Sequence, residues 1–255
     1  MSEIMRCRFM KWSVLLFMCV SNVVLASGQS TIKVAAAANL RYVLSEIEQI
    51  YESKFQGVDL QINYGASGTF YQQIVNGAPY DLFLSADDVR PVKLNEVGVT
   101  SYQSVVYACG KLALYGLRDD VAEVGLKLLE QNGNGRIAVA NPRTAPYGAR
   151  SVEILKSLGL WSSLEKRIVY GDSIAQAAQA AMTGNCEVGF VALSLLLNPD
   201  AKLKGSYFVI PQDMYEPIAQ AGIVIKDGAA TKFFEFILSK ECKTVWEKYG
   251  YSSLK

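Results

Sequence analysis

The chain has 255 residues, a formal net charge of +1 and no histidine. A nearly neutral protein has no general electrostatic attraction to nucleic acid or acidic lipid, so neither is expected as a partner. The lack of histidine excludes Ser–His and Cys–His nucleophilic mechanisms and removes the commonest metal ligand. The cysteines and carboxylates show no metal-ligand spacing. These features count against an enzyme without excluding one, and we expect no enzyme activity, no cofactor and no direct metal-cation site.

The first 26 residues have the layout of a secretory signal peptide. A basic start precedes a mostly apolar run from Trp12 to Leu25, and Ala26 completes a small-residue cleavage pattern. The run is shorter than the ~20 residues that a membrane-spanning helix needs, although an uncleaved anchor is the alternative. We expect cleavage after Ala26 and export to the periplasm.

The five cysteines show no disulfide framework. Cys7 and Cys19 lie in the signal segment. The other three are expected to be buried thiols, the alternative being one disulfide and one free thiol: Cys109, Cys186 and Cys242.

Beyond the signal, short β-branched runs alternate with segments that have apolar residues at helical spacing. This alternation indicates an α/β architecture with largely parallel sheets. The expected strands are Thr31–Ala37, Asp59–Tyr64, Asp81–Ser85, Val106–Tyr115, Arg136–Ala140, Arg167–Tyr170, Glu187–Ala192, Tyr207–Ile210 and Ala221–Ile225. The expected helices include 40–51, 70–75, 152–158, 174–182, 231–239 and 241–249. Helix stops are expected at Gly77, Gly159 and Gly184.

No low-complexity linker divides the chain, so two lobes would have to be joined by extended crossings. The best candidates for these crossings are Val105–Tyr115 and Glu216–Gly222. The middle of the chain would then form one lobe and the two ends the other. We expect lobe 1 to comprise residues 27–106 and 219–255, and lobe 2 to comprise 107–218.

Four strand-to-helix junctions combine small or turn-forming residues with a helix start. Ligands bind at the carboxyl edge of parallel strands, where such junctions gather. The first N–H groups of a helix lack internal partners and carry partial positive charge, so converging helix starts hold an anion without lysine or arginine. The junctions are Ala35–Leu40, Tyr64–Thr69, Asn141–Gly148 and Tyr170–Ile174.

Each junction also has a purely structural interpretation. Asn39 and Ser67 are good N-cap residues that would satisfy their own helices. Asp87 and Asp88 are adjacent in the sequence, and adjacent side chains rarely face one another. They are therefore expected to stabilise the start of a helix rather than to act as a carboxylate pair. Three nearby arginines are expected to be solvated surface charges that could steer an anion inward: Arg41, Arg143 and Arg150.

Several stretches, in order and over nearly the whole exported chain, carry a family resemblance. They are Val34–Leu40, Tyr64–Gly68, Gly77–Asp87 (GAPYDLFLSAD), Ala138–Pro142, Pro146–Gly148, Glu187–Val191 and Tyr249–Tyr251. In these stretches the chain resembles the molybdate-binding proteins of ABC transporters, which have the type II periplasmic binding protein fold. The resemblance implies a two-lobed α/β protein that binds its ligand in the inter-lobe cleft.

The resemblance also implies which residues bind the oxyanion. Many members have serine where this chain has Asn39, and the Ile174 position acts through its backbone N–H. Some members place a ligand-binding tyrosine where this chain has Ala192, so we expect the Tyr147 hydroxyl to replace it. The implied ligand-binding residues are Ala38, Asn39, Ser67, Tyr147 and Ile174.

The expected function is capture of molybdate or tungstate for uptake through the membrane permease of an ABC transporter, by a monomeric periplasmic protein. One alternative is a binding protein for sulfate, phosphate or another anion. Another is an enzyme on the same scaffold, in which Ser67 would be the nucleophile, but no base pairs with it in the sequence. A sensor module is a further alternative, although no extra domain is present to receive a signal.

Overall fold

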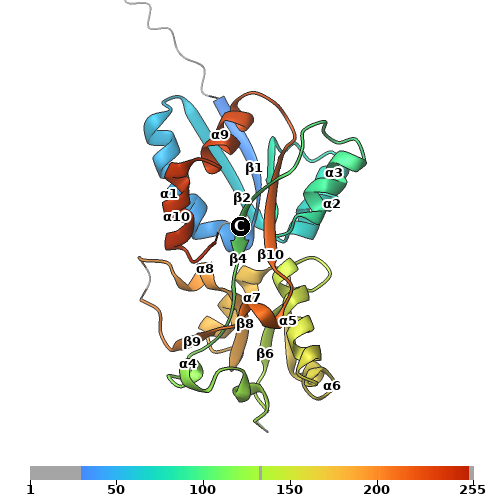
Figure 1. Cartoon of the computed structure of the whole chain (residues 1–255), viewed down its shortest axis with the longest axis vertical. Coiled ribbons are helices and arrows are strands. Elements are labelled where there is room, and N and C mark those ends of the chain that lie inside the picture. The colour runs from blue at the N-terminus through green and yellow to red at the C-terminus, as the bar shows by residue number, and fades with distance from the viewer. Residues whose placement is uncertain (1–29, 132–133, 201, 253–255) are drawn as a thin grey trace, which may run out of the picture.

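Two five-stranded sheets form the framework of the molecule, one in each of two stacked lobes (Figure 1). The computed structural model describes residues 30–131, 134–200 and 202–252. The predicted signal peptide at 1–26, with Cys7 and Cys19, lies outside the described residues.

The first sheet has the strand order β2-β1-β3-β10-β4. Its apolar strands are covered by helices that bury apolar stripes, such as Val43, Leu44 and Ile47 on α1. The strands are β1 (Ser30–Ala37), β2 (Val58–Gly65), β3 (Leu82–Leu84), β4 (Val105–Gly110) and β10 (Ile218–Val224). The helical elements are η1 (Ala38–Leu40), α1 (Arg41–Lys54), α2 (Ser67–Val75), α3 (Val89–Glu96), α9 (Ala229–Ile237) and α10 (Lys240–Lys248).

The second sheet has the order β7-β6-β8-β5-β9. Strands β5, β6 and β8 are buried along their whole length, as their continuous apolar sequences predict. The strands are β5 (Leu112–Gly116), β6 (Ile137–Ala140), β7 (Ile168–Gly171), β8 (Val188–Ala192) and β9 (Ser206–Val209). The helical elements are α4 (Val121–Val124), η2 (Gly125–Leu129), α5 (Pro146–Ser157), α6 (Trp161–Leu164), η3 (Glu165–Arg167), α7 (Ile174–Met182), α8 (Leu193–Leu196) and η4 (Gln212–Met214).

The expectation of largely parallel sheets is wrong, because both sheets are mixed. Strand β10 runs antiparallel to β3 and β4, and β5 runs antiparallel to β8 and β9. The physical reason is the path of the chain between the lobes. Strands β4 and β10 lie beside the two crossings, which run in opposite directions, so these strands pair antiparallel (Figure 1).

The strand expected at Val106–Tyr115 is two strands in two sheets. Strand β4 ends at Gly110 in the first sheet, and β5 begins at Leu112 in the second, so Lys111 alone separates them. A continuous β-rich sequence cannot reveal this change of sheet. The exact lobe boundaries expected from the sequence, 106/107 and 218/219, stay a prediction.

Local signals in the sequence are confirmed at the helix ends and the cysteines. Gly77, Gly159 and Gly184 follow helices with φ of 86°, 72° and 77°, a conformation that favours glycine. The thiols of Cys109, Cys186 and Cys242 are free and buried. Among the described residues, no helix is both long and apolar enough to cross a membrane.

Candidate functional site

The structure forms all four strand-to-helix junctions expected from the sequence. Strand β1 runs into η1 and β2 into α2 in the first lobe, while β6 leads to α5 and β7 to α7 in the second. The five predicted ligand-binding residues lie at these helix starts, and all are buried: Ala38, Asn39, Ser67, Tyr147 and Ile174.

Contacts between the lobes bring these helix starts together. Asn39 and Tyr147 both hydrogen-bond to the side chain of Gln220, each at 2.9 Å. The backbone N–H of Gly68, at the start of α2, donates to the carbonyl oxygen of Thr144 at 2.8 Å. Ala38 and Ser173 line one cavity of about 340 Å³ between η1 and α7. The four helix starts therefore meet between the lobes.

Neither Asn39 nor Ser67 caps its own helix. The Asn39 Nδ2 donates to Gln220 Oε1 and to the Tyr251 hydroxyl at 2.8 Å. The Ser67 Oγ accepts the backbone N–H of Ala86 at 2.9 Å, so its own hydrogen is free to donate elsewhere. By contrast, Ser173 does cap α7, through the N–H of Gln176. The N-cap interpretation is therefore wrong for Asn39 and Ser67.

One buried polar atom stands out at these junctions. The Oδ1 of Asn39 has no hydrogen-bond partner, which among the described residues is true of no other buried side-chain nitrogen or oxygen. An unsatisfied buried polar atom costs about 1–3 kcal/mol, so such atoms commonly mark places where a ligand binds. The unpartnered Oδ1 of Asn39 therefore points to a polar group that the protein itself does not supply.

The phenols around the site are neutral. Burial raises the pKa of Tyr147 and Tyr107 well above the ordinary value, and burial likewise raises the pKa of Tyr251. These hydroxyls keep their hydrogens at any physiological pH. The donors that surround the site are thus uncharged hydroxyls, amides and the N–H groups of helix starts.

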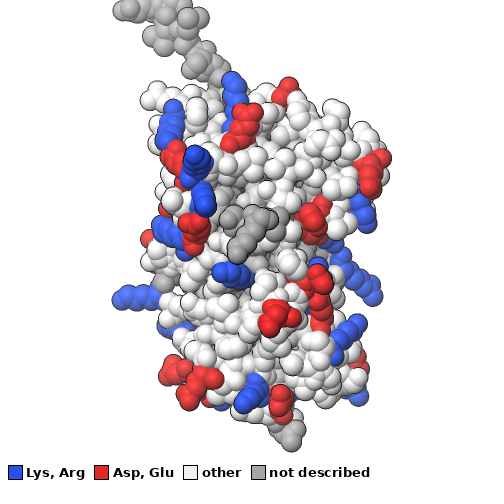
Figure 2. Space-filling view, viewed as in Figure 1, with Lys and Arg blue, Asp and Glu red and all other residues white. Residues whose placement is uncertain are grey.

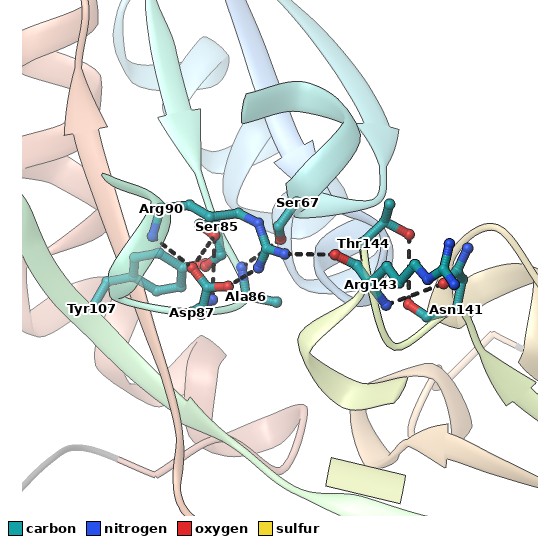
Figure 3. A network of polar contacts seen from close by, with 9 residues as sticks. All are labelled: Ser67, Ser85, Ala86, Asp87, Arg90, Tyr107, Asn141, Arg143 and Thr144. Atoms are coloured by element: carbon teal, nitrogen blue, oxygen red, sulfur yellow. Dashed lines mark hydrogen bonds and ion pairs between the residues drawn. The ribbon is translucent and has the colours of Figure 1, made fainter. Parts of the chain in front are cut away.

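Charged residues lie at the edge of the site rather than within it, and Figure 3 shows the main group. Asp87 pairs with Arg90, and its Oδ1 accepts the Arg90 backbone N–H at 3.0 Å, which confirms the helix-start role. The Arg90 guanidinium also donates to the carbonyl oxygen of Arg143, in the other lobe, at 3.2 Å.

The nearby arginines expected on the surface lie there. Arg41 stacks over the Tyr64 ring, the Arg143 side chain is exposed, and Arg150 pairs with Glu153 at 2.7 Å. On the face shown in Figure 2, positive and negative side chains are interspersed, so neither sign dominates that face.

Ala192 is fully buried where β8 ends and α8 begins. Two residues later, the Ser194 Oγ donates to the carbonyl oxygen of Asn39 at 2.9 Å and lies 3.1 Å from the Tyr251 hydroxyl. The Tyr147 hydroxyl accepts a hydrogen bond from Gln220. It also lies so close to Gly110 that a Cβ added to Gly110 would be only 2.0 Å from the hydroxyl oxygen.

The sequence did not identify Gln220, Ser194 or Tyr251 as members of the hydrogen-bond network around Asn39. A signal was present for Gln220, because it is the one polar residue in the sequence of β10, Ile218–Val224. Nothing in the local sequence indicated Ser194.

A two-lobed α/β fold with helix starts meeting between the lobes defines the class of periplasmic binding proteins. Residues 32–252 match the family described as bacterial extracellular solute-binding protein, and the chain belongs to that family. It is 38% identical over 231 residues to the molybdate-binding protein ModA of Azotobacter vinelandii, covering 89% of this chain and 91% of that one.

Two further comparisons agree with the family assignment. The chain is 37% identical over 238 residues to the molybdate-binding protein ModA of Rhodobacter capsulatus, covering 91% of this chain and 92% of that one. The solved structure of the Azotobacter vinelandii periplasmic molybdate-binding protein matches with a TM-score of 0.82 at 34% identity, over 88% of this chain and 100% of that one.

Proposed function

We propose that this protein captures molybdate or tungstate in the periplasm and delivers it to the membrane permease of an ABC transporter. It acts as a monomer and carries out no catalytic step. The observation that carries the proposal is the meeting of helix starts from both lobes around the buried side chains of Asn39 and Ser67. The relatives named molybdate-binding proteins support these ions as the ligand.

We propose that the oxyanion contacts Ala38, Asn39, Ser67, Tyr147 and Ile174. The first-turn N–H groups of their helices lack intrahelical partners and suit a dianion. The free hydrogen of Ser67 adds a neutral donor. Burial favours such a site, because hydrogen bonds to a charged group are stronger where water is excluded.

Selection between oxyanions would rest on size. Molybdate, tungstate and sulfate are all tetrahedral dianions, so charge and donor number do not separate them. Rigid donors placed for the larger ions would leave sulfate with unmatched donors, each costing about 1–3 kcal/mol. Sulfate competing with molybdate at similar concentration would refute this account.

Ligand binding would accompany closure of the lobes about the two crossings. The crossings lie side by side, since β4 and β10 pair from Ile218 opposite Gly110. Closure excludes water and joins donors from both lobes around the ion. X-ray scattering profiles that are identical with and without saturating molybdate would count against closure.

The main alternative is a binding protein for sulfate or phosphate on the same fold, and it differs only in the ion that fits. The enzyme alternative lacks a base for Ser67, whose Oγ accepts the backbone N–H of Ala86. Among the described residues, no lysine or carboxylate hydrogen-bonds to that hydroxyl.

Thermal melting in the presence of molybdate, tungstate, sulfate, phosphate or buffer alone tests the proposal. A ligand at roughly a thousandfold above its Kd adds about 4 kcal/mol of stability, which is an easily seen shift. Replacing Asn39 and Ser67 together should abolish the shift while the ligand-free protein still melts cooperatively. The proposal is wrong if neither molybdate nor tungstate shifts the melting curve of the wild-type protein.

A further inference from the structure

Gln220 lies between the two sides of the candidate site and touches both. It is fully buried in β10, where its Oε1 accepts Asn39 Nδ2 and its Nε2 donates to the Tyr147 hydroxyl, each at 2.9 Å. The pairing of β10 with β4 changes register directly after Gln220, and bulges of this kind re-aim side chains. The Tyr107 hydroxyl also reaches Gln220 Oε1, at 3.3 Å.

The direction of these hydrogen bonds leaves the wrong atom free for an anion. Both hydrogens of Asn39 Nδ2 are engaged, one by Gln220 and one by Tyr251. The atom of Asn39 that remains unpartnered is Oδ1, which only accepts hydrogen bonds. A carbonyl oxygen beside an oxyanion is repulsive, so the amide in this orientation does not serve a dianion.

Turning over the two amides together solves this problem, and it requires only that the hydroxyl hydrogens of Tyr147 and Tyr251 rotate. If Asn39 turned alone, its oxygen would face the oxygen of Gln220 in place of the 2.9 Å hydrogen bond. If both turn, Gln220 Nε2 donates to Asn39 Oδ1, and Gln220 Oε1 accepts the hydrogen of Tyr147. The contacts of Gln220 with Asn39 and Tyr147 are kept with their direction reversed, and Asn39 Nδ2 takes the unpartnered position. The Tyr251 hydroxyl, which now accepts from Asn39 Nδ2, then turns its hydrogen away from the Asn39 carbonyl oxygen and Ser194 and donates to Asn39 Oδ1.

We propose that Gln220 is a positioning residue for oxyanion binding, because it sets the orientation of the Asn39 amide. Ligand binding selects the orientation in which Asn39 Nδ2 faces the anion and the Tyr147 hydroxyl donates to Gln220. This inference rests on the proposed function and adds a residue that does not itself touch the ligand. It also changes the expected role of Tyr147, which then serves the anion through the backbone N–H at the start of α5 and not through its hydroxyl.

A double-mutant cycle with Gln220→Met and Asn39→Ser tests the proposal, with the molybdate Kd measured by titration calorimetry. Methionine has a similar length but cannot orient an amide, so Gln220→Met should weaken binding by about ten- to a hundredfold when Asn39 is present. A serine hydroxyl rotates freely and needs no partner to orient it. In the Asn39→Ser background, Gln220→Met should therefore change the Kd by less than about threefold.

The melting temperature of each ligand-free variant separates positioning from structural damage. Each variant should still melt cooperatively, and Gln220→Met should lower the melting temperature by less in the Asn39→Ser background, because the hydrogen bond between Asn39 and Gln220 is already lost there. Equal losses of affinity in both backgrounds would mean that Gln220 is merely structural, and an unchanged affinity in Gln220→Met alone would also overturn the proposal. Failure of the wild-type protein to bind molybdate would instead refute the proposed function, and the positioning role with it.

The wild-type protein gives a second test that does not depend on the folding of Gln220→Met. The side-chain amide hydrogens of Asn39 are identified by NMR as the pair lost in Asn39→Ser. Molybdate should shift one of these hydrogens strongly, since it moves from a neutral partner to a dianion. Asn39 amide signals that stay unchanged at saturating molybdate would contradict the proposal.

Discussion

The backbone N–H of Gly68 donates to the carbonyl oxygen of Thr144 at 2.8 Å, and this hydrogen bond joins the start of α2 to the other lobe. A Cβ built on Gly68 would lie 2.8 Å from the Thr144 Cα and 3.0 Å from its oxygen. Both neighbours are backbone atoms, which cannot turn aside as a side chain can. The contact between the lobes at this point therefore requires glycine.

Replacing Gly68 with alanine should hinder closure of the lobes without harming the open protein. We expect the molybdate Kd to rise by about tenfold or more, while the ligand-free stability stays equal or rises by about 0.5–1 kcal/mol, because alanine favours helix. Calorimetric titration and thermal melting measure the two effects. Thr69→Ala, at the exposed next position of α2, is the matched control and should bind normally. Unchanged affinity in Gly68→Ala would contradict this role.

The contact of Arg90 with the other lobe should contribute to closure in the same way but more weakly. Arg90 spans the lobes through the Arg143 carbonyl oxygen at 3.2 Å, and its side chain is about one-fifth exposed, at 21%. We expect Arg90→Ala to weaken molybdate binding by about two- to tenfold, as is typical of partly exposed polar contacts.

The matched control for Arg90→Ala is Arg150→Ala, because the pair of Arg150 with Glu153 stays within α5. This control should leave the Kd of molybdate unchanged in the same titration. Equal effects of the two substitutions would show that Arg90 acts only as a general surface charge.

Replacing Ser67 with alanine should reduce both affinity and stability. The substitution removes the donor that we propose for the anion, and it leaves the backbone N–H of Ala86 without its 2.9 Å partner. We expect a ten- to hundredfold loss of molybdate affinity and a loss of about 1–3 kcal/mol in the free energy of unfolding. Ser151→Ala is the control, since that buried hydroxyl donates to the carbonyl oxygen of Tyr147. It should alter stability far more than affinity.

Alkaline pH should destabilise the protein from about pH 10 upward. Burial raises the pKa of Tyr107, Tyr147 and Tyr251 above the ordinary value of 10.0, so the folded state keeps protons that the unfolded chain releases. Stability is therefore full below the unfolded pKa and falls as the pH rises toward the folded values, by up to about 1.4 kcal/mol per pH unit for each phenol.

Urea unfolding between about pH 8 and about pH 11 measures this effect. Tyr147→Phe removes one of the three buried phenols and its contribution to the pH dependence. The free energy of unfolding of this variant should therefore fall less steeply above about pH 10 than that of the wild-type protein. A free energy of unfolding that stays level across the alkaline range would show that the buried phenols do not control stability there.

The sequence by itself determined the helix starts, the helix stops and the alternation of strands with helices. These features are local: apolar spacing defines a helix face, and glycine at Gly77, Gly159 and Gly184 supplies the positive φ that ends a helix. Short sequence motifs added the resemblance to molybdate-binding proteins and, with it, the positions that are expected to bind the ion.

Only the tertiary structure decided which distant residues meet. Gln220 contacts Asn39 and Tyr147, which are 181 and 73 positions away, and Lys111 marks a change of sheet inside one β-rich run. The sequence also could not distinguish an N-cap from a ligand donor at Asn39 and Ser67, because both roles use the same polar atom. The direction in which that atom points depends on partners that are distant in the sequence, which are Gln220 and Tyr251 for Asn39 and the Ala86 N–H for Ser67. Only the folded chain brings these partners to the helix starts.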